Sequence, residues 1–477
     1  MSGSDSKKKI DAQVRKEVAR YEDMLMSGRK EYFDEDDLLD VADYYYNDMS
    51  RGDDALKCLD YALKLHPSST LALLMKAEVL YFSGEREKAW KILDGIKDKN
   101  DPDVMYYFGL FNLEEGSYNE AEMCYQRAYF GQVGNSVDMF CQIVWDYLDR
   151  NITAGLDRWF ALLPDTLKGE REVLEAKAEY LRQKGNIVET ISIEEKLLDI
   201  DPYNTVYWNG LAKLYCLTRN LDKAQECITY ALDINPSESE CLLMGGEISG
   251  MRGDYEQAGE YYSKYLETND KDALAYFNNS QILCYQEKYE EALVQLEYAK
   301  KYSHDSNVSD IEIDEQFSTL YWALGTISLS RFYLDKARKE GLPDELYYMR
   351  MLSIELKSGK RGRVVDCVKI LIDNAIKENR DPSAVLLMLT SFGRISLVKK
   401  TIEDVKEKLP QYIDRCSPFL AFVAMHERKW KVFFPSLKTA IDCAPEITHH
   451  VFSGVFPETL DVKDYYDYAM HNIRSPK

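Results

Sequence analysis

Small and large apolar residues recur along the chain at two alternating helical spacings. Within residues 205–238 the first spacing is i, i+3, i+4, i+7 and the second is i, i+4, i+7, and each is one stripe of a helix. The residues at these positions are Trp208, Leu211, Ala212 and Tyr215, followed by Ala224, Ile228 and Ala231. Small residues in both stripes allow a close approach, and Pro236 stops the second helix. The pattern therefore predicts a pair of antiparallel helices.

The same pattern returns about every 34 residues, which is the period of a helical repeat array. Eight units begin near residues 36, 70, 102, 135, 171, 205, 239 and 273. Their second helices carry, at the position of closest approach, Ala55, Ala89, Ala121, Ala154, Thr190, Ala224, Ala258 and Ala292. A fixed period over most of a chain favours a continuous solenoid and not separate globular domains.

These units resemble the tetratricopeptide repeat (TPR), whose pattern is W-x2-L-G-x2-Y, then A-x3-F, then P. Residues 205–238 carry it most completely, from Trp208 to Pro236. The resemblance implies an all-α fold, an α-solenoid of about twelve TPR or TPR-like helix pairs that form a superhelix. It also implies capping helices at both ends, for which Ile10–Met26 and Thr459–Ile473 have suitable patterns.

The period weakens after Ala299, and this suggests how the chain is organised. We expect an N-terminal capping helix in residues 1–35, a TPR array of about eight repeats in 36–304, an acidic loop in 305–317, a second, degenerate TPR-like array in 318–445 and a C-terminal cap in 446–477. Five of the eleven residues 305–315 are acidic, which predicts an exposed segment that proteases cut first. Gly341 and Pro343 predict a shortened helix before them, and Pro435 predicts a late start or a kink in the last pair.

Charge and composition exclude several classes of protein. The net charge of −22 disfavours nucleic acid and anionic lipid as partners, and no apolar run reaches the roughly 18 residues of a membrane span. The charge is uneven, because residues 316–477 have 25 basic and 20 acidic residues while the preceding part is strongly acidic. The ten cysteines are scattered and no secretory signal is evident, so we expect a cytoplasmic protein with reduced thiols.

Candidate chemistry is sparse, and we expect neither an enzyme nor a bound cofactor or metal. The six histidines form no H-E-x-x-H motif, and His449 and His450 are adjacent, which suits a shared ligand poorly. The glycines of residues 245–253 fall on repeat positions and lack a P-loop string. Cys58, Cys124, Cys227 and Cys367 share one repeat position, which indicates packing and not a nucleophile.

What remains is a binding surface, and the resemblance places it on the first helices. In TPR proteins positions 2, 5, 6, 9, 12 and 13 of each unit face a concave groove. Large apolar residues fill many of these positions here, and the candidate groove residues are Tyr81, Phe82, Tyr106, Leu110, Phe140, Ile143, Tyr147, Met244, Phe277 and Tyr285. Leu243, Met251 and Leu274 lie on the same stripe. Such a stripe is either an exposed recognition surface or is buried by tight curvature of the array.

The predicted function is a non-catalytic protein-interaction scaffold or adaptor that binds a peptide or partner protein. Acidic residues around the stripe favour a ligand with apolar anchors flanked by basic residues. The chaperone-binding carboxylate clamp of some TPR proteins is absent, since only Asn209 and Lys213 faintly resemble it. The alternative is a regulatory or sensor subunit whose basic second arm contacts an anionic partner, through Lys357, Lys360, Arg361, Arg363, Lys399 and Lys400.

Overall fold

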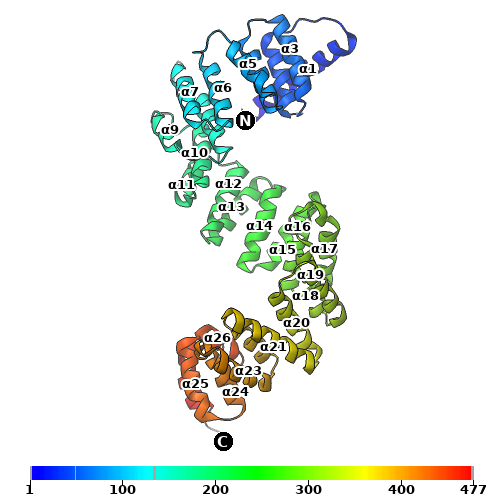
Figure 1. The fold of residues 1–477 in the computed structure, drawn as a ribbon, viewed down its shortest axis with the longest axis vertical. Helices are drawn as coiled ribbons and strands as arrows, with labels where there is room; N and C mark the ends of the chain where they lie inside the picture. Colours follow the sequence, from blue (N-terminus) through cyan, green and yellow to red (C-terminus); the bar gives the residue numbers. More distant parts are fainter. Residues whose placement is uncertain (1–2, 49, 133–135, 474–477) are drawn as a thin grey trace. The chain divides into compact units, whose positions relative to one another are not determined.

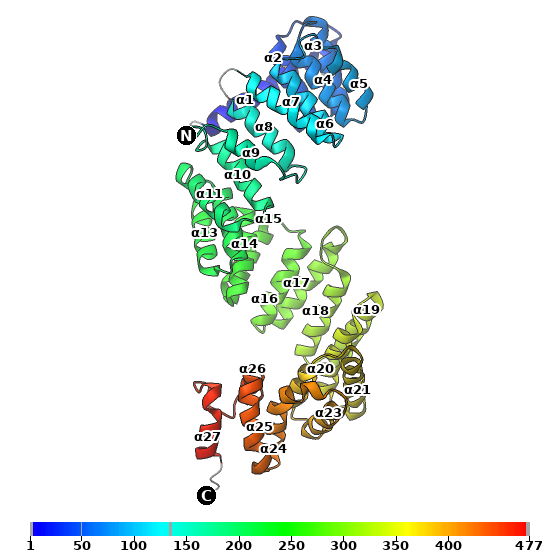
Figure 2. The ribbon, with the colours of Figure 1, turned by 60° about the vertical axis from the view of Figure 1, so that its left-hand side comes forward.

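The computed structural model describes residues 3–48, 50–132 and 136–473, and over these residues all regular structure is helical (Figure 1). Consecutive helices pack against each other, as α16, α17 and α18 do (Figures 1 and 2). The expected all-α solenoid of helix pairs is confirmed. The chain divides into two units, residues 1–218 and 219–477. Among the described helices, none combines the length and apolar character needed to cross a membrane.

The first unit holds the helices that precede residue 219. They are α1 (Gly3–Ser27), α2 (Glu35–Asp43), a π-helical turn η1 (Tyr44–Asp48), α3 (Gly52–Leu65), α4 (Thr70–Phe82), α5 (Arg86–Gly95), α6 (Pro102–Glu114), α7 (Tyr118–Gly131), α8 (Val137–Leu148), α9 (Leu156–Leu162), α10 (Arg171–Gln183), α11 (Ile187–Ile200) and α12 (Thr205–Leu217). The predicted first helices begin within two residues of the expected positions in all six repeats of this unit.

The second unit continues the same alternation. Its helices are α13 (Leu221–Ile234), α14 (Ser239–Arg252), α15 (Tyr255–Thr268), α16 (Ala273–Tyr285), α17 (Tyr289–Tyr302), α18 (Asp310–Ala323), α19 (Ile327–Glu340), α20 (Asp344–Ser358), α21 (Arg361–Glu378), α22 (Ser383–Ser391), α23 (Ile395–Lys408), α24 (Ser417–His426), α25 (Trp430–Cys443), α26 (Pro445–Val451) and α27 (Tyr465–Asn472). Short 3-10 turns are η2 (Ser303–Asp305), η3 (Pro410–Tyr412), η4 (Asp414–Cys416) and η5 (Val462–Asp464).

Small residues set the close approach within two of the helix pairs. A Cβ atom at Gly109 would lie 2.5 Å from Cδ1 of Tyr125, and one at Gly246 would lie 2.8 Å from Cζ of Tyr262. The two glycines occupy the same repeat position, and so do the two tyrosines. A glycine on the first helix therefore makes room for a buried tyrosine ring on the second, and the repeat pattern follows from this packing.

The local sequence explains where first helices begin. Ser69, Asp101, Ser136, Asn204 and Asp272 each precede a first helix, and each side chain accepts a hydrogen bond from a backbone N–H of the first turn. These caps satisfy donors that the helix itself leaves unpaired. The fourth pair is irregular, because its second helix α9 has only seven residues and begins after the expected Ala154.

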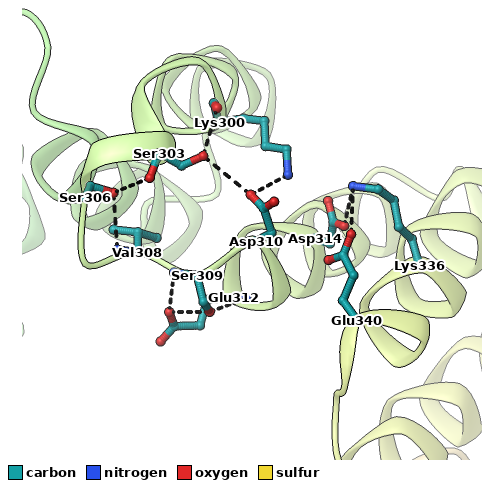
Figure 3. A network of polar contacts seen from close by, with 10 residues as sticks. All are labelled: Lys300, Ser303, Ser306, Val308, Ser309, Asp310, Glu312, Asp314, Lys336 and Glu340. Carbon is teal, nitrogen blue, oxygen red and sulfur yellow. Dashed lines mark hydrogen bonds and ion pairs between the residues drawn. The ribbon is translucent and has the colours of Figure 1, made fainter.

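The predicted acidic loop is wrong for most of its length. Helix α18 begins at Asp310, and Ser309 and Glu312 form a capping box (Figure 3). The Ser309 hydroxyl accepts from the Glu312 N–H at 3.2 Å, while a Glu312 carboxylate oxygen accepts from the Ser309 N–H at 3.0 Å. Acidic residues in a first turn are favourable, because they face the positive end of the helix. Ile313 is fully buried below them, so this stretch is the start of the ninth first helix.

Two ion pairs fix that helix to its neighbours. Lys300 lies 2.7 Å from a carboxylate oxygen of Asp310, and Lys336 lies 2.6 Å from one of Asp314 (Figure 3). The Asp314 side chain is fully buried. The acidic stretch thus lies inside the second unit, and the division of the chain after residue 218 has no counterpart in the predicted boundaries.

Three smaller expectations about helix bounds are also not met by the structure. Helix α19 has 14 residues and ends at Glu340, with Gly341 following in a left-handed conformation, so it is not shortened. Helix α25 begins at Trp430 with Pro435 inside it, so it does not start late. At the C-terminus the expected helix from Thr459 is replaced by η5 and the eight-residue α27, which begins at Tyr465.

Candidate functional site

Most of the predicted groove residues of the first unit lie in the core. The exposed fractions are 2% for Tyr81, 4% for Leu110, 0% for Phe140, 0% for Ile143 and 4% for Tyr147. The prediction of one exposed strip across α4, α6 and α8 is therefore wrong. The alternative, burial of these aromatic side chains by neighbouring helices, holds for this part of the array.

Buried tyrosine hydroxyls in this region donate to carboxylates of neighbouring helices. Tyr107 donates to Glu78 at 2.8 Å, Tyr125 to Asp146 at 2.7 Å and Tyr147 to Glu122 at 2.9 Å. Such hydrogen bonds offset the cost of burying both polar groups. They explain why tyrosine, which also suits an exposed recognition surface, is so frequent in the interior here.

Asp146 is the most perturbed carboxyl of this network. Burial raises its pKa to about 6, although hydrogen bonds from Tyr125 and Tyr106 oppose the rise. Arg150 is hydrogen-bonded to Glu114 beside it. The network is closed on itself by protein partners, so it favours a structural role over acid–base catalysis.

Exposed apolar side chains remain at the two ends of certain first helices. Phe82 is 45% exposed and Tyr285 is 65% exposed, both at position 13 of their repeats. Leu71 and Leu274, at position 2, are also exposed. Among the other predicted residues, Tyr106 and Met244 are half-buried, and Phe277 is buried. Of the predicted residues, those at positions 9 and 12 are therefore buried, whereas position 13 is exposed at Phe82 and Tyr285 but buried at Tyr147.

In the second unit, exposed apolar side chains lie on the successive first helices α14 and α16, namely Met251, Leu274 and Tyr285. Residues 274 and 285 of α16 are eleven positions apart, and residues 244 and 251 of α14 are seven apart. Both spacings return to the same side of a helix. The two helices touch, since a Cβ atom at Gly250 would lie 3.1 Å from Cδ1 of Ile282.

One further aromatic residue completes this surface, and the sequence pattern did not single it out. The rings of Tyr255 and Tyr285 stack with centroids 4.7 Å apart and planes 9° apart. Tyr255 is the first residue of the second helix α15, a position where Tyr118 and Tyr289 recur in other repeats. That recurrence was the available signal. We call the surface formed by Met244, Met251, Tyr255, Leu274 and Tyr285 the apolar face.

The basic residues of the alternative hypothesis are partly engaged within the chain. Arg363 pairs with the buried Glu355 at 3.3 Å, and Lys399 pairs with Glu427 at 3.3 Å. The Lys357 ammonium donates to the carbonyl oxygen of Trp322 and lies over its ring at 4.2 Å. Three of the six basic residues therefore contact other residues of the same chain.

Two observations bear on metal and thiol chemistry in the described part of the chain. Within it, no three His, Cys, Asp or Glu side chains gather as a metal site would require. Burial raises the pKa of the Cys58 thiol to about 12 and that of Cys367 to about 11, so neither is a thiolate at neutral pH.

Comparison with known proteins finds relatives among repeat proteins. No family model matches the sequence. The chain is 29% identical over 140 residues to anaphase-promoting complex subunit 3 of Schizosaccharomyces pombe, which covers 29% of this chain and 20% of that protein. It is 28% identical over 216 residues to the human protein O-mannosyl-transferase TMTC3, covering 41% of this chain and 23% of that protein. It is 23% identical over 252 residues to TPR repeat-containing protein MJ1428 of Methanocaldococcus jannaschii, covering 48% of this chain and 43% of that protein.

The matched segments thus span less than half the length of each relative. Among solved structures, a tetratricopeptide repeat protein from Parabacteroides merdae aligns at 14% identity and a TM-score of 0.36, over 53% of this chain and 98% of that one. The Cut9–Hcn1 hetero-tetramer of the anaphase-promoting complex aligns at 15% identity and a TM-score of 0.36, over 91% of each chain.

Proposed function

Since the chain belongs to the tetratricopeptide repeat family, we propose that it is a non-catalytic interaction scaffold whose apolar face binds a peptide segment of a partner protein. The observation that carries this proposal is the exposure of Met251 and Tyr285, at 63% and 65%, on neighbouring first helices. Large apolar side chains that gather at the surface are typical of binding sites.

The apolar face has dimensions and charge that suit an extended peptide. Leu274 and Tyr285 are eleven residues apart on α16, or about 16 Å at 1.5 Å per residue, which about five residues of extended chain would span. On α14, Glu240 and Glu247 share the stripe of Met244 and Met251. The expected ligand therefore has apolar anchors flanked by lysine or arginine.

A scaffold role agrees with the names of two relatives. The curated name of one relative describes a subunit of a complex, and that of another describes TPR repeats. TMTC3 is named as a transferase, but this chain matches only 23% of it. None of the ten cysteines, all within the described residues, forms a disulfide, and a location in a reducing compartment such as the cytoplasm would fit this.

Site-specific photo-crosslinking of the full-length protein tests this proposal. Peptides are first selected from a random library on the wild-type protein. A photoreactive phenylalanine then replaces either Met251, on the apolar face, or Phe332, which is 58% exposed on α19. We expect selected peptides to crosslink through position 251 and not through position 332. Crosslinks through position 332 alone would place the binding site elsewhere.

A further inference from the structure

A groove between the second helices α21 and α23 involves none of the helices of the apolar face. The two helices lie side by side (Figures 1 and 2). Two adjoining cavities, of about 360 Å³ and about 230 Å³, form the groove, and both are lined by Val365 and Leu397. The first lies at residues 361–365 and 393–397, and the second continues to residues 373 and 408. The groove therefore follows about 12 residues of α21, or about 18 Å at 1.5 Å per residue.

The floor of this groove is apolar. Val365 is 39% exposed, Leu397 is half-buried, and Val368 and Ile372 are buried. Residues 365, 368 and 372 form one stripe of α21, at i, i+3 and i+7. Because both walls are helices, their backbone groups are hydrogen-bonded internally and offer little to the backbone of a ligand. An extended segment would bury N–H and C=O groups there without partners, whereas a helix satisfies its own. The floor therefore favours a helix as the occupant.

The rim of the groove is positively charged, although the whole chain carries a net charge of −22. Five basic and two acidic residues line the groove, which gives a net charge of +3. The acidic residues lie only in the second cavity, so the end near the starts of the two helices is lined by basic residues alone. The charged lining residues are Arg361, Lys369, Arg394, Lys400 and Lys408, with Asp373 and Asp404.

These five basic residues lack an acidic partner within the chain. Across the described residues, none of them forms an ion pair. Their neighbours Arg363 and Lys399, on the same two helices, do pair with glutamates of the chain. A ligand that brings carboxylates to this rim would therefore form new ion pairs without breaking existing ones. The charge of the rim selects an acidic occupant.

We propose that this groove binds an amphipathic α-helix of a partner protein. Large apolar residues of that helix face the floor, and glutamate or aspartate residues lie along the edges of its apolar side, most densely near Arg361 and Arg394. A helix of about 12 residues matches the length of the groove. Burial of Val365 and Leu397 stabilises the complex, and the opposite charges fix the position of the helix. The apolar face, by contrast, favours a ligand with basic flanks, so the charge of a ligand distinguishes the two surfaces.

A library of displayed helical peptides tests this proposal on the full-length protein. Each peptide has about 14 residues, or four turns, with one apolar stripe, and glutamate and lysine occur at equal frequency elsewhere. Selection on the wild-type protein should enrich glutamate over lysine. Fluorescence anisotropy of the selected peptides should show affinity that falls as salt is added, because exposed ion pairs are screened.

A substitution in the floor locates the binding. Val365→Glu puts a charge at the centre of the groove and should abolish binding of the selected peptides. The matched control is Val432→Glu on α25, where the valine is 41% exposed, and this variant should bind as wild type does. Circular dichroism establishes that each variant is folded.

Charge reversal on the rim provides an independent test. Arg361→Glu combined with Lys400→Glu should weaken binding by about tenfold or more, since attraction at two positions becomes repulsion. The control combines Lys377→Glu with Lys406→Glu, which makes the same change of charge on the same two helices outside the groove. The control should change the affinity much less. This comparison decides if Val365→Glu does not fold.

Several results would overturn the proposal. These are a selection that yields no binder, selected peptides without an excess of glutamate, full binding by the folded Val365→Glu variant, or equal weakening by the two pairs of charge reversals. A wild-type dimer in sedimentation experiments that Val365→Glu dissociates would assign the groove to a second copy of the chain instead. Each failure leaves crosslinking through position 251 unaffected, so the two proposals are separable.

Discussion

The Tyr285 ring stacks on the Tyr255 ring, with planes 9° apart, and joins the end of α16 to the start of α15. Tyr285 nevertheless remains 65% exposed. Tyr285→Ala should therefore lower the free energy of unfolding by about 1 kcal/mol, mostly through loss of the ring pair. Thermal unfolding followed by circular dichroism measures this. A loss several times larger would show that Tyr285 is a core residue.

Phe140 and Phe82 allow a direct comparison between a core position and a surface position of the predicted stripe. Phe140 is fully buried, so Phe140→Ala should cost roughly 3–5 kcal/mol. Phe82 is 45% exposed, and Phe82→Ala should cost less than half as much. Urea unfolding of the full-length variants gives both values. Equal, small losses of unfolding free energy would indicate that Phe140 is exposed at the surface.

Asp146 should make the stability of the first unit depend on pH. Its pKa is about 6 in the folded protein and near 4 when unfolded, so the folded state binds the extra proton between these values. Stability contributed by this group is therefore lost as pH rises from about 4 to 6, up to about 3 kcal/mol. Asp146→Asn should remove this loss. The free energy of unfolding of the variant should therefore increase relative to that of wild type as pH rises.

Hydrogen exchange across α7 and α8 at pH 4.5 and pH 7 measures this locally. Protection in wild type should fall relative to Asp146→Asn at the higher pH. The same pH dependence in both proteins would mean that Asp146 is ionised in the folded state at both pH values.

The capping box at Ser309 should stabilise the start of α18. Ser309→Ala removes the hydroxyl that accepts from the Glu312 N–H, and loss of such a cap costs about 1 kcal/mol. Hydrogen exchange in residues 310–323 should become faster. Thr326→Ala is the control, because Thr326 precedes α19 without a side-chain cap. Unchanged exchange after Ser309→Ala would indicate that buried Ile313 and Asp314 alone hold the helix start.

Periodicity predicted the helix pairs well because their packing depends on a few local residues. The alternation of Gly109 with Tyr125, or of Gly246 with Tyr262, is visible in the sequence as small and large residues at fixed positions. The start of α18 has a local signal in the capping-box spacing of Ser309 and Glu312, but the acidic composition of the same segment favours an exposed loop, and the two signals conflict.

The site was harder to predict because burial depends on neighbouring helices. Tyr147 and Tyr285 occupy the same repeat position and are both aromatic, yet one is 4% exposed and the other 65%. Tyr147 donates to Glu122 on α7, whereas Tyr285 stacks on the surface residue Tyr255. Whether each tyrosine is buried depends on the residue that it contacts, and that residue lies on another helix.

The affinity of a selected peptide for variants of the apolar face tests the scaffold proposal most directly. Met251→Ala combined with Tyr285→Ala removes the two most exposed anchors of that face, and Phe332→Ala removes an equally exposed ring elsewhere in the unit. Fluorescence anisotropy with the full-length proteins should show a loss of about tenfold or more for the double variant, as for central interface residues, and almost none for the control. Unchanged affinity of the folded double variant would contradict the assignment of the apolar face as the binding site.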